Sequence, residues 1–186
     1  IMVILVIIGI VPSFIVKNVV VNSYETRAVS IREVNLKNQC DILGNQLMKE
    51  NYLREPDSDV INGELSMLSA IYNGRILIIN KDAKIIKDTY DIDVGKYALS
   101  EEVIQCFEGK STANYDDKNA YIEMTSPITK MDSNTIEGVM LVSISTSEIE
   151  DSIDMLENRG NLLLSIICIL VLVFGYLLAG VLVKPF

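Results

Sequence analysis

Six polar side chains in the middle of the sequence have the chemistry to bind a small ligand. Three of them alternate along a β-rich run, and alternation puts them on one face of a strand, opposite Ile122 and Met124. A lysine and two tyrosines from flanking loops could complete a site for a small anion. The six residues are Lys96, Tyr97, Tyr115, Tyr121, Glu123 and Thr125. We favour the simpler interpretation that this strand face is turned to solvent or to a second subunit, since antiparallel sheets often have one solvent-facing side.

Two groups of carboxylates raise the question of a divalent cation. They are Asp88, Asp91 and Asp93 in "KDTYDID", and Asp116 and Asp117 in "YDD". Oxygen-rich loops can hold Ca²⁺ or Mg²⁺, but this spacing lacks the glycine and the terminal glutamate of an EF-hand loop. We therefore expect solvated turns here, and we predict neither a metal site nor a cofactor.

The sequence offers little for catalysis. It contains no histidine, and its three cysteines, Cys40, Cys106 and Cys168, form no CxxC pair, so ordinary zinc sites and histidine-based triads are excluded. Cys40 and Cys106 could pair in an oxidising compartment, or they could be small buried apolar residues, which is the interpretation we favour. We expect this chain not to be an enzyme in itself.

The elements that would position these residues lie between two apolar ends. The 186 residues are 49% apolar and 22% charged, with a mean hydropathy of +0.32. All 25 acidic residues lie between Glu25 and Glu157. This separation predicts a membrane protein with a polar middle domain.

The stronger of the two predicted membrane spans is the C-terminal one. Leu162 to Val183 carries no charged side chain, and 22 helical residues extend about 33 Å, enough to cross a bilayer. We place this span at 161–183. The first span, 1–21, is interrupted by Lys17 and Asn18, and the chain begins at Ile1 rather than Met, so we expect the span to be truncated. The alternative, a signal peptide, lacks a basic n-region and an A-x-A cleavage site.

Residues 22–160 carry 14 basic and 25 acidic side chains, a net charge of −11. Such a surface argues against nucleic acid as a partner and against direct docking of this domain on anionic lipid, because both require basic patches. The predicted environment of the two apolar ends is the lipid bilayer.

Within the polar domain the sequence predicts helices on the faces of a sheet. A long helix over 24–50 carries an apolar stripe at spacings of 7, 4, 3 and 4, which can either pack on its own domain or form a dimer seam. The stripe consists of Val29, Leu36, Cys40, Leu43 and Leu47. We expect further helices at 64–73, 101–108 and 147–160, and strands at 75–80, 85–89, 111–115, 120–129 and 137–146. The predicted fold class is α+β, with a five-stranded antiparallel sheet and two flanking membrane helices.

The order of these segments carries a resemblance. A long helix, "GRILIINKDAKII", Val94-Gly95-Lys96, a short helix, "TSPI" and "EGVMLVSIST" are followed by a helix and a membrane span. This arrangement resembles the extracytoplasmic PAS-like (Cache, or PDC) sensor region of bacterial transmembrane sensor histidine kinases. Lys184 and Pro185 resemble the start of a HAMP linker, which would occupy 184–186.

The resemblance implies a signal-input module. The chain would be a two-pass cell-membrane protein with residues 22–160 outside the cytoplasm. It would form a homodimer, bind an unknown small molecule, ion or peptide, and control a response regulator through a cytoplasmic kinase beyond this sequence. The alternatives to a histidine kinase are the input region of a chemoreceptor or of a cyclic-dinucleotide enzyme, or a membrane-anchored structural or adaptor protein.

Overall fold

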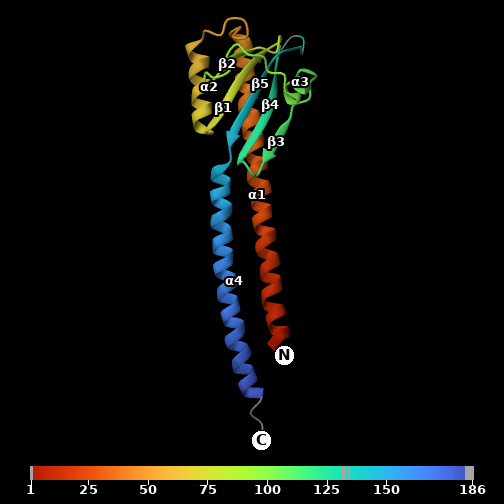
Figure 1. The fold of residues 1–186 in the computed structure, drawn as a ribbon, viewed down its shortest axis with the longest axis vertical. Coiled ribbons are helices and arrows are strands. Elements are labelled where there is room, and N and C mark those ends of the chain that lie inside the picture. The colour runs from red at the N-terminus through yellow and green to blue at the C-terminus, as the bar shows by residue number, and fades with distance from the viewer. Residues whose placement is uncertain (1, 131–132, 134, 183–186) are drawn as a thin grey trace. The chain divides into compact units, whose positions relative to one another are not determined.

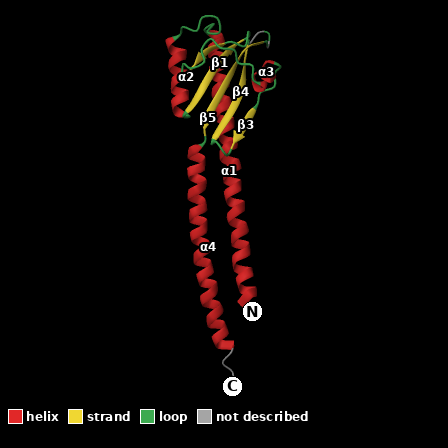
Figure 2. Cartoon of the chain, viewed as in Figure 1, coloured by secondary structure: helices red, strands yellow, loops and turns green. Residues whose placement is uncertain are grey.

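The computed structural model describes residues 2–130, 133 and 135–182 of the chain, and contains four helices and five strands in that part (Figures 1 and 2). Their order along the chain is α1 (Met2–Lys49), α2 (Asp59–Ile71), β1 (Gly74–Asn80), β2 (Ile85–Asp88), α3 (Glu101–Phe107), β3 (Ala113–Asp116), β4 (Tyr121–Thr129), β5 (Ile136–Ser145) and α4 (Ser147–Leu182). Lys184 and Pro185, the predicted HAMP junction, lie outside the described residues.

The chain divides into two compact units. One contains residues 1–28 and 148–186, and the other contains residues 29–147. Helices Ile7–Lys49 and Ser147–Leu177 are long and apolar enough to cross a membrane, judged by length and composition, with mean hydropathies of 1.4 and 2.4. Residues 29–147, which we call the sheet domain, contain the sheet, α2, α3 and about the last six turns of α1.

The sheet has five antiparallel strands in the order β2-β1-β5-β4-β3. Strands that are consecutive in sequence pair at both edges of the sheet, β1 with β2 and β3 with β4. In between, β1 pairs with β5, where Arg75 lies opposite Ser143. The α+β fold class and the antiparallel sheet predicted from the sequence are therefore confirmed.

Each face of the sheet packs against a different helix. Ser126 Oγ on β4 lies 3.5 Å from Asp41 Oδ1 on α1, and Ser126 shares its face with Met140 on β5. The opposite face packs against α3, where Val103 and Cys106 join strand residues such as Val139 in one apolar cluster. Figure 2 shows α3 at the β3 and β4 side of the sheet and α2 at the β1 side.

The apolar stripe of α1 is buried within this single chain. Its five members have exposed fractions between 0% and 8%, which agrees with packing on the helix's own domain. Other apolar side chains of α1 face outward instead. The most exposed of these in the sheet domain are Ile31, Val34 and Ile42, each more than half exposed.

Helix α2 begins five residues earlier than the sequence suggested. We expected a helix from Glu64, because Gly63 and the turn-rich "REPDSD" precede it. In the structure Ser58 is the N-cap, with its side chain accepting a hydrogen bond from the amide of Ile61 at 3.4 Å, and Asp59 lies in the first turn. The cap and the burial of Ile61 stabilise this additional turn despite Gly63.

Candidate functional site

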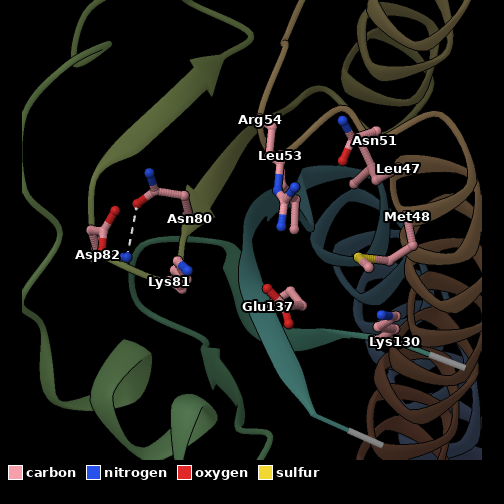
Figure 3. A pocket seen from close by; sticks show the side chains of 10 residues that line it. All are labelled: Leu47, Met48, Asn51, Leu53, Arg54, Asn80, Lys81, Asp82, Lys130 and Glu137. Carbon is pink, nitrogen blue, oxygen red and sulfur yellow. Dashed lines mark hydrogen bonds between the residues drawn. The ribbon is translucent and has the colours of Figure 1, made fainter. Parts of the chain in front are cut away.

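A polar pocket opens where one end of the sheet meets the end of α1. It has a volume of about 500 Å³ and is lined by residues of α1, the segment after it, the β1–β2 turn and the facing ends of β4 and β5 (Figure 3). The lining residues are Leu47, Met48, Asn51, Leu53, Arg54, Asn80, Lys81, Asp82, Lys130 and Glu137. We call this the end pocket.

The end of α1 forms one wall of the end pocket. The helix stops in a Schellman motif: the amide of Tyr52 donates to the carbonyl of Leu47 at 2.9 Å, and the amide of Asn51 donates to that of Met48 at 3.2 Å. Asn51 takes the left-handed conformation that this motif requires, with φ of 55°. The reversal turns Leu53 and Arg54 back toward the pocket.

The β1–β2 turn forms the opposite wall. The side-chain oxygen of Asn80 accepts hydrogen bonds from the amides of Asp82 at 3.1 Å and Lys84 at 3.0 Å, while Ala83 has φ of 58°. An asparagine that binds the backbone two residues ahead fixes a turn. The turn therefore holds Lys81 and Asp82 at the rim.

Gly138 brings strand β5 close to this wall. A Cβ atom at Gly138 would lie 2.6 Å from the carbonyl oxygen of Ile79 and 3.2 Å from both methyl groups of Leu53. Only glycine fits a backbone approach this close. The neighbouring residue, Glu137, thus lies beneath Leu53 and Arg54 in the pocket, as Figure 3 shows.

Charge is the main chemical feature of the end pocket. Arg54, Lys81 and Lys130 supply three cations, and Asp82 and Glu137 supply two anions. Within the described part of the chain, the side chains of these five residues form no ion pair with one another. Opposite charges that lie around one cavity without neutralising each other can each bind a group of a small polar ligand.

Three of the six predicted site residues do share one face of the sheet. Tyr121, Glu123 and Thr125 lie on the α3 face of β4, but Thr125 is 1% exposed. Its hydroxyl accepts from the amide of Thr112 at 3.0 Å and lies 2.9 Å from the Thr112 hydroxyl, while the hydroxyl of Ser143 donates to Glu123 at 3.2 Å. Tyr121 also forms a side-chain hydrogen bond with Asp116, so all three side chains are already engaged within the fold.

The other three predicted residues do not gather around that face. Lys96 donates to Asp93 Oδ1 at 2.5 Å, and Tyr97 is 66% exposed. Tyr115 pairs with Ile122, and this register places it on the opposite side of the sheet from Glu123. The register therefore does not bring Tyr115 together with Glu123, because cross-strand partners point to the same face. Ligand binding by any of the six residues stays a prediction.

A charged network at the end of β2 was not predicted from the sequence. Asp88 is fully buried and binds the Nε and Nη2 atoms of Arg75 at 3.0 and 2.6 Å, and Nη2 also lies 2.6 Å from Asp93. Asp88 further accepts hydrogen bonds from the amides of Tyr90, Ile92 and Asp93, each at 2.9 Å. Two of the carboxylates considered for a cation, Asp88 and Asp93, are thus bound by a guanidinium.

This network sets the ionisation of Asp88. Burial by itself would raise the pKa of the carboxyl, but the hydrogen bonds from Arg75 and from three backbone amides outweigh burial and hold the pKa well below its usual range. The role of Arg75 is to fix the loop after β2. The sequence contained a signal for this network, because an arginine begins a β-rich run that precedes an aspartate-rich turn. The pairing of the arginine with the aspartates depends on the hairpin register, which the sequence does not show.

The cysteines of the sheet domain are free and buried. Cys40 lies on α1 and Cys106 on α3, which pack on opposite faces of the sheet. Burial raises the pKa of the Cys40 thiol to about 12 and also raises the pKa of Cys106. The interpretation as small buried residues agrees with the structure, and neither thiol has the low pKa of a nucleophile.

Solved structures offer three informative comparisons. The sensor domain of histidine kinase DctB from V. cholerae has 14% identity and a TM-score of 0.47, covering 72% of this chain and 59% of that one. The ligand-binding domain of Campylobacter jejuni chemoreceptor Tlp3, in complex with L-valine, has 14% identity and a TM-score of 0.46, with coverages of 72% and 60%. The chain is similar to sensor domains.

A domain of a sensory box/GGDEF family protein from Vibrio parahaemolyticus gives 10% identity and a TM-score of 0.45, covering 67% of this chain and 57% of that one. The chain thus spans about three fifths of the length of these solved chains. No protein-family model matches the sequence, and no curated protein matches it.

Proposed function

We propose that this chain is the signal-input and membrane-spanning region of a two-component sensor histidine kinase. The sheet domain would receive a stimulus outside the cell, and the two apolar helices would pass it to a cytoplasmic kinase. The chain itself would perform no catalysis. Its partners would be a second copy of itself and, through the kinase, a response regulator.

One observation carries this proposal: a single helix links a candidate membrane span with a ligand-sized pocket. Helix α1 runs without a break from Met2 to Lys49, so the helix that is apolar enough to cross a membrane also supplies Leu47 and Met48 to the end pocket. At the C-terminal end of the sheet domain, α4 begins at Ser147, two residues after β5 ends at Ser145. A ligand that binds one state of the pocket more tightly can therefore bias the position of α1.

The end pocket suits a small polar ligand that carries both signs of charge or several oxygens. Its cations can bind carboxylate or phosphate oxygens, and Glu137 and Asp82 can bind an ammonium group. The apolar carbons of Leu47, Met48 and Leu53 can cover an uncharged part of the same molecule.

The first test is a thermal-shift screen of the full chain with charged metabolites. A compound at 100 times its Kd stabilises the folded state by about 2.7 kcal/mol and raises Tm. We expect that rise to be lost in Arg54→Gln and kept in Lys118→Gln, which removes the same charge from an exposed turn outside the pocket. A rise that persists unchanged in Arg54→Gln and Lys130→Gln would place the ligand elsewhere.

The second test concerns the output. Residues 1–186 joined to the HAMP and kinase region of a characterised sensor should change reporter expression with the same compound. The coding sequence that follows Phe186 separates the kinase from its alternatives, because a chemoreceptor or a cyclic-dinucleotide enzyme would carry a different output domain. Binding with no effect on the chimera would favour an anchored adaptor.

A further inference from the structure

An apolar groove runs between α1 and α4 within the unit of residues 1–28 and 148–186. It has a volume of about 470 Å³, and its walls include Val16, Val20 and Leu163. The two helices lie close together, since a Cβ atom at Gly160 would come within 2.8 Å of the Lys17 side chain. The groove is therefore a defined feature of this helix pair.

Two cations lie along this groove. Lys17 donates through Nζ to Asn161 Oδ1 at 2.6 Å, and Arg159 lies two residues before Asn161. No acidic side chain lines the groove in the described part of the chain. The ammonium of Lys17 has three hydrogens, so it can bind an oxygen of another molecule in addition to Asn161.

The cations also lie where both helices change from polar to apolar sequence. Residues 1–16 and 162–183 carry no charge. Lys17 directly follows the first apolar stretch and Arg159 shortly precedes the second, so both cations lie at the ends of these stretches that adjoin the polar middle of the sequence. In a membrane such positions lie at the level of the lipid headgroups. A ligand matching this arrangement has an anion next to a long apolar chain.

We infer that this groove binds an anionic phospholipid. The phosphate contacts Lys17 and Arg159, and one acyl chain lies along the apolar wall. A net anionic headgroup fits better than a zwitterionic one, because the groove has no carboxylate to bind a choline or an ethanolamine. The inference requires that the helices lie in a membrane, and it does not depend on the sensor role or on the kinase.

The test measures lipid retention by the full chain. The protein is purified in mild detergent, incubated with phosphatidylglycerol or phosphatidylcholine, and examined by native mass spectrometry. We expect stronger retention of phosphatidylglycerol, and a loss of about fivefold for each cation removed in Lys17→Gln and Arg159→Gln. In Lys17→Gln, the new side-chain amide can still donate a hydrogen bond to Asn161, so the contact between α1 and α4 can persist.

The matched control is Arg27→Gln, which removes one positive charge from α1 at a position outside the groove. It should keep lipid retention. Equal retention of the two lipids, or an equal loss in Arg27→Gln, would overturn the inference. So would efficient disulfide cross-linking of two copies through Val16→Cys, because a second copy would then fill the groove.

Discussion

At the residue scale, the most constrained polar group in the sheet domain is Asp88. Its two oxygens receive five hydrogen bonds, two from Arg75 and three from backbone amides. A buried carboxylate is tolerated only when its charge is compensated in this way. Asp88 at the end of β2 and Asp93 after it therefore order the loop leading to α3, and a bound cation is not needed to account for these two carboxylates.

We predict that Asp88→Asn destabilises the sheet domain by about 3 kcal/mol, because Arg75 loses its buried partner and the new amide group cannot accept from all three backbone amides. Thermal unfolding of the full chain in detergent, followed by the near-UV signal of its tyrosines, measures this loss. Asp117→Asn, on an exposed turn, should change Tm little. A Tm within experimental error of wild type in Asp88→Asn would contradict the assigned role.

The same carboxylate gives the domain a pH dependence of known sign. The pKa of Asp88 is lower in the folded than in the unfolded chain, so ionised Asp88 adds to the free energy of unfolding. This contribution is complete above about pH 4 and is lost as the pH falls toward the folded-state pKa. Wild type should thus lose more stability between pH 5 and acid conditions than Asp88→Asn does.

At the element scale, close backbone contacts set the positions of the strands. Gly74 and Gly138 are both placed where a Cβ atom would meet the backbone of the adjacent strand, at 2.5 Å from Ser143 O and 2.6 Å from Ile79 O. They stand at the two ends of the β1–β5 pairing. The contacts explain why glycines occur inside strands, where they are otherwise unfavourable.

We predict opposite effects for two glycine-to-alanine changes. Gly138→Ala should destabilise the chain by about 1–3 kcal/mol, because the added methyl group meets the carbonyl of Ile79 and the strands must separate. Gly63→Ala should stabilise it by up to about 1 kcal/mol, because that methyl group meets nothing within 4 Å inside α2. Melting curves of both variants check the pair, and a stabilised Gly138→Ala would refute the packing described for β5.

The burial of the α1 stripe also bears on dimerisation, which stays a prediction. Leu36 and Leu47 are fully buried inside one chain, so neither is available to a second copy without unfolding. Any contact between copies along this helix would use its outward side instead, where Ile31, Val34 and Ile42 are exposed.

At the scale of the whole molecule, the chain combines two candidate membrane helices with a sheet domain. Each helix is continuous with part of the sheet domain along the chain, α1 through its C-terminal turns and α4 through its junction with β5. This continuity is the physical basis of the proposed signal transfer.

We predict that the sheet domain lies outside the cytoplasm. The variant Lys118→Cys, whose changed residue is exposed on the β3–β4 turn, should react in intact cells with a membrane-impermeant maleimide. Cys40 and Cys106 are buried, and Cys168 lies within the candidate membrane span of α4, so the native thiols should give a low background. Reaction only after the cells are permeabilised would reverse the proposed orientation.

The sequence by itself determined the features that depend on local patterns. The uncharged stretches indicated the apolar helices, and the alternation from Tyr121 to Thr125 indicated a two-faced strand. The helix predicted at 101–108 ends before Gly109, which has φ of 89°. Such signals lie within one element and need no partner. They sufficed to predict the fold class and most strand positions to within two residues.

Only the tertiary structure decided which distant segments meet. The pairing of β1 with β5, the placement of Tyr115 on the far face, and the meeting of Asn51, Asn80 and Glu137 around the end pocket all depend on contacts between segments far apart along the chain. A polar residue carries no local sign of the partner that will bury or expose it. The charges that we propose as ligand-binding groups therefore lie where the ends of α1 and of the strands meet a turn, rather than on the strand face that the sequence indicated.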